Sequence, residues 1–176
     1  AGAVAMNGAT GGTLSKEDLI PAAMKGEAIV SPSIHGDNVL PSLLGGFILL
    51  QSSSPEHFKR IEGASDICFA IVLPDLEVLT SNARQHLPDS IPLARAVDHA
   101  ARLGLLINSI NTNDTAAIGA LIMSDDLIEP TRSRLLPPYQ LIKEAALAAG
   151  ASGCALSGSG PAMYAVCGSS VDASHI

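Results

Sequence analysis

The stretch "CALSGSGPAMYAVCG", residues 154–168, predicts a strand, a tight turn and a second strand. Gly158 and Gly160 allow the turn to take positive φ angles and let a ligand approach the backbone closely, and Ser159 adds a hydroxyl. The stretch lacks the Lys-Ser/Thr ending of a phosphate-binding P-loop, and a strand follows it where a P-loop needs a helix. A plain hairpin turn explains the pattern equally well.

Three helices and one strand are expected around this hairpin. "PPYQLIKEAALAAGA", residues 137–151, has helical spacing and a C-terminal stop at Gly150. Residues 91–108 carry apolar side chains at amphipathic spacing, and residues 113–126 contain a further short helix. "DICFAIVLP", residues 66–74, reads as a buried strand that ends at a proline.

The N-terminal part begins with small apolar residues and a glycine-rich turn. Ser15 and Asp18 have the spacing of a capping box, which predicts the start of a helix. "LLGGFILLQS", residues 43–52, predicts a strand entered through a Gly-Gly bend. "SSSPEHFKRIEGAS", residues 52–65, is expected to be a loop and the domain boundary.

Composition favours a packed globular protein of the α+β class. Hydrophobic residues make up 47% of the 176 residues and charged residues 15%. The net charge of −7, without a Lys/Arg cluster, argues against a nucleic-acid surface. Three cysteines without CxxC spacing indicate thiols in a reducing compartment, and no apolar run is long enough to cross a membrane. The expected domains are residues 1–52 and 53–176.

The segment "HGDN", residues 35–38, places His35, Asp37 and Asn38 at the start of an apolar element. Because proline is tolerated in the first turn of a helix, Pro41 puts the expected helix start near Asp37 or Asn38. One of these side chains as a helix cap explains part of the pattern. A cap needs one side chain and the segment offers three, so the surplus indicates a binding or catalytic site.

Two arginines and one glutamate complete the candidate residues. Arg84 and Arg132 lie in loop or helix-end settings, where an arginine can hold a carboxylate or phosphate with two hydrogen bonds. A solvated surface arginine is the default explanation of each. Glu27 lies near the end of a predicted helix, where a carboxylate is poorly matched to the helix dipole, and this hints at a cation partner.

Three stretches in order and spacing resemble the homoserine kinases, a branch of the GHMP small-molecule kinases. They are "GEAIVSPSIHGDNVLPSLLGGF" (26–47), "VLPDLEVLTSNARQHLP" (72–88) and "IEPTRSRLLPPYQLIKEAALAAGASGCALSGSGPAMYAV" (128–166). The resemblance implies the end of a ribosomal protein S5 domain 2-like domain followed by a ferredoxin-like domain, with the active site between them. It also implies ATP- and Mg²⁺-dependent phosphorylation of the L-homoserine hydroxyl, on the route to threonine.

The resemblance assigns roles residue by residue. His35, Asp37 and Asn38 match positions that contact homoserine, and Asp37 is also where related kinases place a catalytic base. If Asp37 instead pairs with the substrate ammonium, its charge is already used and it is an anchor, which is the role we favour. Arg84 and Arg132 match the arginines that hold the substrate carboxylate.

The remaining assignments concern the nucleotide and the metal. Glu27 matches a Mg²⁺-associated glutamate, and Gly158, Ser159 and Gly160 match a motif that lines the site near the substrate and phosphates. The family's Gly/Ser-rich loop for the ATP phosphates belongs just before Ala1 and is absent, as are the first strands and the last elements. We therefore expect the 176-residue chain alone not to turn over.

Other assignments stay open at this point. The chain could come from a kinase for another small alcohol such as mevalonate or galactose, although two arginines favour an acceptor that carries a carboxylate. It could be a non-catalytic module that binds an amino acid, or an α+β domain whose polar clusters are only caps and turns. The resemblance is compatible with a homodimer and with a cytoplasmic protein, or a stromal one in a plant or alga.

Overall fold

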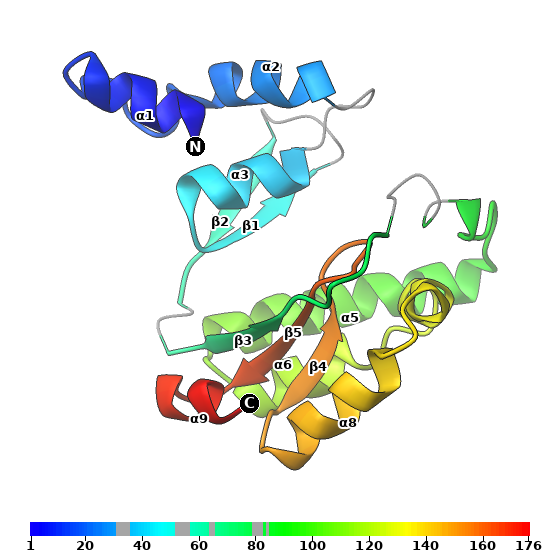
Figure 1. Cartoon of the computed structure of the whole chain (residues 1–176). Helices are drawn as coiled ribbons and strands as arrows, with labels where there is room; N and C mark the ends of the chain where they lie inside the picture. The colour runs from blue at the N-terminus through cyan, green and yellow to red at the C-terminus, as the bar shows by residue number, and fades with distance from the viewer. Residues whose placement is uncertain (31–35, 52–56, 64–65, 79–82, 84) are drawn as a thin grey trace. The chain divides into compact units, whose positions relative to one another are not determined.

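The computed structural model divides into two compact units, the N-terminal unit, residues 1–62, and the C-terminal unit, residues 63–176 (Figure 1). The structure describes residues 1–30, 36–51, 57–63, 66–78, 83 and 85–176. The boundary expected between residues 52 and 53 lies outside these ranges. Each unit is described by itself.

The described part of the N-terminal unit contains three helices: α1 (Gly2–Ala9), α2 (Ile20–Val30) and α3 (Gly36–Leu44). The capping box predicted at Ser15 is confirmed, since the Asp18 amide donates to Ser15 Oγ at 3.1 Å and the Ser15 amide donates to Asp18 Oδ2 at 2.9 Å. A turn separates this box from the regular helix, so α2 begins later than the box alone suggests.

Helix α3 begins at Gly36, one or two residues before the predicted start at Asp37 or Asn38. Pro41 therefore lies beyond the first turn, where its missing N–H removes one hydrogen bond of the helix. Burial of one apolar face offsets that loss, because most helix stability in proteins comes from tertiary packing. The buried residues of this face are Gly36, Leu40, Leu43 and Leu44.

A two-stranded antiparallel sheet packs against α3. Strand β1 (Phe47–Leu50) follows a bend in which Gly45 and Gly46 have φ angles of 78° and 71°, as the Gly-Gly pair predicts. Strand β2 (Phe58–Ile61) pairs with β1. The prediction of a loop over residues 52–65 is wrong at β2, since four residues with two charges in the middle carry too little apolar pattern to signal a strand.

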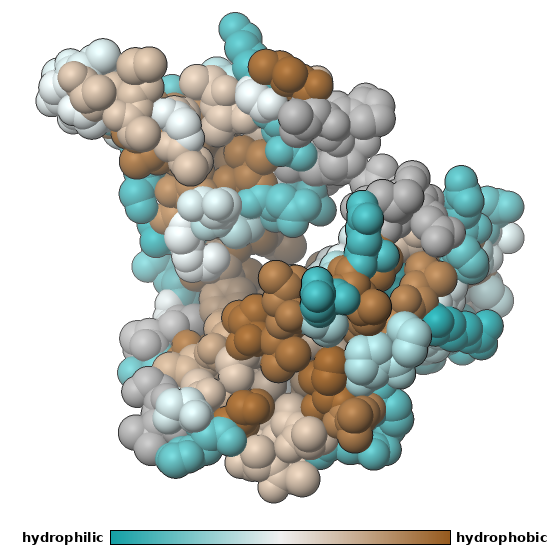
Figure 2. Space-filling model, viewed as in Figure 1, coloured by the Kyte–Doolittle hydropathy of each residue, from teal (hydrophilic) through white to brown (hydrophobic). Residues whose placement is uncertain are grey.

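The C-terminal unit is built on an antiparallel sheet in the order β3-β5-β4. The predicted hairpin is confirmed as β4 (Gly153–Leu156) and β5 (Met163–Cys167). Strand β3 (Cys68–Val72) was expected to be fully buried, but it is an edge strand with Phe69 39% and Ile71 65% exposed. Figure 2 shows apolar surface in this unit beside hydrophilic side chains.

The helices of the C-terminal unit lie between and after these strands. Helices α5, α6 and α8 confirm the three predicted ones, whereas α7 and α9 were not predicted because four and six residues are too few for a periodic pattern. No helix among the described ranges is both long and apolar enough to cross a membrane. The bounds are α5 (Leu93–Asn111), α6 (Thr115–Ile122), α7 (Glu129–Arg132), a 3₁₀ turn (Ser133–Leu135), α8 (Tyr139–Ala148) and α9 (Ser170–His175).

Helices cover the sheet of this unit from two sides. On one side, α6 approaches β4 so closely that a Cβ on Gly119 would lie 2.0 Å from the backbone oxygen of Ser152. On the other, α8 packs on the strands through a core cluster. The buried members of this cluster are Leu136, Ala146, Ala151, Cys154, Leu156, Met163 and Ala165. The α+β class expected from the sequence is confirmed.

Candidate active site

Helices α1, α2 and α3 of the N-terminal unit surround a hollow of about 860 Å³. Glu27 of α2 and Asn38 of α3 line it, so two of the predicted site residues meet in one place. The Glu27 carboxylate is the one ionisable side chain among the described residues of its wall. The wall is otherwise formed by small and apolar residues: Ala1, Gly2, Ala3, Val4, Ala5, Ala22, Ala23, Gly26, Val39, Ser42 and Leu43.

Asp37 lies in the first turn of α3 and is exposed, next to Asn38 but not in the wall of the hollow. A carboxylate in that turn is favoured by the helix dipole. Both Asp37 and Asn38 lie within α3 as the structure has it, and the residues just before Gly36 are outside the described ranges. His35 lies outside the described residues.

In the C-terminal unit, Arg132 lies against the turn that joins β4 to β5. Its Nη1 donates a hydrogen bond to the Gly158 carbonyl oxygen at 2.9 Å. Its Nε is buried and has no hydrogen-bond partner in the part of the chain that the structure describes. Gly158 and Gly160 have φ angles of 61° and 79°, so the turn uses the backbone freedom that these glycines provide. Arg132 and the Gly158–Gly160 turn thus form one cluster, as expected for a shared site.

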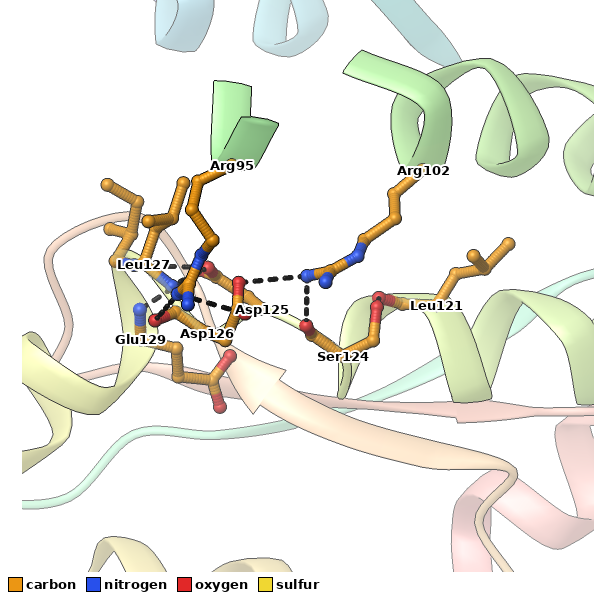
Figure 3. Close-up of polar contacts among 9 residues, drawn as sticks. Arg95, Arg102, Leu121, Ser124, Asp125, Asp126, Leu127 and Glu129 are labelled. Carbon is orange, nitrogen blue, oxygen red and sulfur yellow. Dashed lines mark hydrogen bonds and ion pairs between the residues drawn. The ribbon is translucent and has the colours of Figure 1, made fainter. Parts of the chain in front are cut away.

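The turn before α7 is fixed by Asp125 (Figure 3). Asp125 Oδ1 accepts hydrogen bonds from the amides of Leu127 and Ile128, and Oδ2 accepts one from the amide of Glu129 at 2.9 Å. Burial raises the pKa of Asp125, but the three amide donors outweigh it and hold the pKa below its ordinary value. Asp125 therefore caps the short helix that carries Arg132.

Asp126 joins the same turn to α5. Arg102 Nη1 donates to Asp126 Oδ1 at 2.9 Å and to the Ser124 carbonyl at 2.6 Å, and Arg95 Nη2 lies 2.9 Å from Asp126 Oδ2 (Figure 3). The hydrogen bond with Arg102 lowers the pKa of Asp126 and raises that of Arg102. These groups are partly exposed, so the contacts contribute more to the geometry of the turn than to stability.

A partly buried polar cluster lies behind α7 and consists of Glu129, Tyr139 and Lys143. The Tyr139 hydroxyl donates a hydrogen bond to Glu129 Oε1, and Lys143 Nζ donates to the Tyr139 oxygen at 2.8 Å. Burial and the hydrogen bond to Glu129 raise the pKa of Tyr139. The sequence analysis missed this cluster. Two features of the sequence could have indicated it: Tyr139 and Lys143 are spaced i, i+4 on α8, and Glu129 lies three residues before Arg132.

The structure thus brings together two groups of predicted residues, each within its own unit: Glu27 with Asn38, and Arg132 with Gly158–Gly160. Arg84 lies outside the described residues. Within the described ranges, no three His, Cys, Asp or Glu side chains gather at a point where they could hold a metal ion. Mg²⁺ in kinases is bound by one or two carboxylates together with substrate phosphates, so Glu27 alone fits a metal–nucleotide complex better than a protein-only metal site.

Comparison with known proteins agrees with the sequence resemblance. Residues 106–176 match the family model described as GHMP kinases C terminal. A homoserine kinase of Arabidopsis thaliana is 37% identical over 165 residues, which cover 93% of this chain and 44% of the relative. One of Thermococcus gammatolerans is 44% identical over 169 residues, which cover 96% of this chain and 56% of the relative.

A solved structure is similar over almost all of the chain. The crystal structure of homoserine kinase from Cytophaga hutchinsonii superimposes with a TM-score of 0.88 at 40% sequence identity, and the match covers 97% of this chain and 54% of that one. The chain spans about half the length of the curated relatives it matches. Over that half, the chain is a homologue of the homoserine kinases, and its C-terminal part matches the C-terminal domain of the GHMP kinases.

Proposed function

We propose that the protein containing this chain is a homoserine kinase, which uses ATP and Mg²⁺ to phosphorylate the side-chain hydroxyl of L-homoserine, on the route to threonine. The observation that supports this most directly is the pairing of Arg132 with the Gly158 turn, in a chain that is homologous to homoserine kinases over nearly its whole length. We expect this function to reside in the whole protein. The 176-residue chain supplies only part of the site.

Arg132 provides the cation that the substrate carboxylate needs. Its guanidinium is always charged and presents several N–H donors, of which one on Nη1 is used by Gly158. We propose that the other Nη donors bind the carboxylate while the contact to Gly158 is kept. Arg84 is proposed to share this role.

Asp37 and its neighbours are proposed to bind the ammonium group, which is on the same carbon as the carboxylate. A carboxylate at Asp37 suits the substrate ammonium, with Asn38 and His35 as hydrogen-bonding partners. An Asp37 that pairs with the ammonium is an anchor rather than a base. Exchange of Asp37 for Asn in the whole protein then raises KM for homoserine with little change in kcat, whereas a base role lowers kcat.

Glu27 and the Gly158–Gly160 turn are proposed to serve the nucleotide. Mg²⁺ bound to ATP would neutralise charge on the transferred phosphoryl group, and Glu27 is proposed to hold that ion. The backbone amides and the Ser159 hydroxyl of the turn are donors of the kind that bind phosphate oxygens. Glu27→Gln is expected to raise the Mg²⁺ concentration needed for half-maximal rate, whereas Glu17→Gln, at an exposed position outside the hollow, leaves it unchanged.

The test is release of ADP by the protein expressed from the whole gene, with L-homoserine, L-threonine, mevalonate and galactose offered in turn. Turnover on homoserine alone is the expected result, with the 176-residue chain inactive beside it. Turnover on a different acceptor would assign another GHMP kinase activity. If no acceptor is turned over but calorimetry detects binding of an amino acid, the protein is a binding module and not a kinase.

A further inference from the structure

The buried cluster of Glu129, Tyr139 and Lys143 is not part of the proposed chemistry, yet it is tightly built. Glu129 is 8% exposed, and the side chain of Lys143 is 18% exposed. Lys143 Nζ lies 3.5 Å from Glu129 Oε1, 2.8 Å from the Tyr139 oxygen and 5.3 Å from the centre of the Tyr139 ring. Three polar groups from two helices therefore satisfy one another in a place with little water.

This cluster is connected to Arg132 by one turn of helix. Glu129 is the first residue of α7 and Arg132 is the last, and the Arg132 amide closes the turn on the Ile128 carbonyl at 3.1 Å. A helix of four residues has too few internal hydrogen bonds to fix its own direction. The direction of the Arg132 side chain therefore depends on what holds Glu129.

Both ends of Glu129 are held. Asp125 accepts its backbone amide at 2.9 Å, and Tyr139 and Lys143 of α8 hold its carboxylate. Helix α8 packs on the sheet whose hairpin carries Gly158, the partner of Arg132. The cluster thus ties α7 to the same scaffold on which the Gly158 turn is built.

We propose that Glu129, Tyr139 and Lys143 are positioning residues that hold the Arg132 guanidinium at the Gly158 turn and thereby set the affinity for the substrate carboxylate, without touching the substrate. This inference rests on the proposed function. A buried ion pair is rarely retained for stability, because apolar side chains of similar size often give equal or greater stability. The directional hydrogen bonds of the cluster instead fix one orientation of α7.

The first test compares Tyr139→Phe and Lys143→Met with the wild type, all in the protein from the whole gene. We expect KM for L-homoserine to rise about three- to tenfold, because the lost hydrogen bond is within the cluster and weakens the contact of Arg132 with the substrate only indirectly. KM for ATP is expected to stay unchanged and kcat to stay within about twofold, since the cluster acts on one binding contact. Lys143→Arg keeps the positive charge and the N–H donors, so its KM for L-homoserine is expected to be close to that of the wild type.

Glu144→Gln is the matched control, because Gln140 and Glu144 form an exposed hydrogen bond on the same helix that does not face α7. It is expected to leave every constant unchanged. Unchanged KM for homoserine in both Tyr139→Phe and Lys143→Met would overturn the proposal. An equal rise in KM for homoserine and for ATP would also overturn it, because it would indicate that the whole protein is destabilised. If Tyr139→Phe does not fold, Lys143→Met and Lys143→Arg make the same comparison.

Hydrogen exchange separates this inference from the proposed function. In Tyr139→Phe, the amides of Thr131 and Arg132 are expected to exchange faster than in the wild type, whereas in Glu144→Gln they do not. If exchange is faster in Tyr139→Phe but the wild-type protein does not phosphorylate homoserine, the cluster does position α7, and homoserine is not the substrate. If the wild-type protein phosphorylates homoserine but the variants show unchanged exchange and unchanged KM, the protein is a homoserine kinase and the cluster has no positioning role.

Discussion

Arg132, at the end of α7, and Gly158, in the turn between β4 and β5, are joined by a 2.9 Å hydrogen bond across 26 residues of sequence. The bond connects the two parts of the C-terminal unit that the sequence analysis selected independently, one for its charge and one for its glycines. It leaves the guanidinium with further donors for a ligand. A change at Arg132 should therefore alter binding of the substrate carboxylate before it alters the fold.

Arg132→Lys is expected to raise KM for L-homoserine about 10- to 100-fold in the protein from the whole gene. Lysine keeps the charge but loses the fork of N–H donors, and a hydrogen bond to a charged group contributes about 1.5–3 kcal/mol. Steady-state kinetics with homoserine varied at saturating ATP measure the effect. Arg134→Lys, at an exposed neighbouring position, is the control. Equal constants for the two variants would contradict the assignment of Arg132.

Gly119→Ala is expected to destabilise the protein by about 1–3 kcal/mol, the usual cost of overpacking. The added Cβ would lie 2.0 Å from the backbone oxygen of Ser152, which cannot move without shifting β4. Gly104→Ala in α5 is the matched control, because its Cβ meets nothing within 4 Å and the change is expected to stabilise the helix by about 0.5–1 kcal/mol. Urea unfolding curves of both variants measure the change in unfolding free energy. Equal midpoints for the two variants would show that α6 does not pack this closely on β4.

Asp125 is expected to make stability depend on pH on the acid side. Its folded pKa lies below the ordinary value of 3.8, so the unfolded chain binds the proton first as the pH falls. The stabilisation is complete above the unfolded pKa and is lost as the pH drops through the folded one. Asp125→Asn is expected to flatten the dependence of unfolding free energy on pH below about 4. An unchanged slope between wild type and variant would contradict the capping role.

Tyr164 is expected to produce a loss of stability on the alkaline side. Burial, with a smaller effect from the Glu129 charge, raises its pKa from the ordinary value of 10.0 to about 12. The unfolded chain therefore ionises first, so the stabilisation is present below pH 10 and is lost as the pH rises to 12. Between pH 10 and 12 the wild type is expected to lose on the order of 2 kcal/mol of unfolding free energy through this ionisation, and Tyr164→Phe is expected not to show this loss.

Absorbance of tyrosinate in wild type and Tyr164→Phe measures this titration directly. The difference between the two proteins is expected to appear near pH 12 in the folded state and near pH 10 in urea. Ionisation of Tyr164 near pH 10 in the folded protein would show that the side chain is in contact with water. Phenylalanine keeps the ring that packs on Phe69 with centres 5.9 Å apart, so the variant changes the hydroxyl alone.

Long periodic segments were predictable because their pattern is local. The amphipathic stretch of α5 and the helix that stops at Gly150 each repeat one spacing over many residues, and the hairpin is marked by two apolar runs around the Gly158 turn; the structure has all three. Strand β2 and helix α7 have neither signal. Each has four residues with a mixed polar and apolar pattern, and each is stabilised by a partner outside its own segment, β1 in one case and α8 in the other.

The candidate residues divide in the same way. The sequence alone selected Glu27, Asn38 and Arg132 as candidates, because their functional groups and positions suit a binding site. Spacing could not reveal Glu129, Tyr139 and Lys143, since a glutamate, a tyrosine and a lysine are ordinary surface residues until burial removes water from them.

The class of the fold, its main helices, the hairpin and the side chains able to hold a carboxylate or a cation could be predicted, since they follow from local periodicity and functional groups. Chain packing sets which of these groups come together: Arg132 contacts Gly158, Glu27 and Asn38 line one hollow, and Glu129, Tyr139 and Lys143 form a polar cluster behind α7. A hydrogen bond between distant residues depends on packing that orders both partners at once, and such packing leaves no local pattern in the sequence.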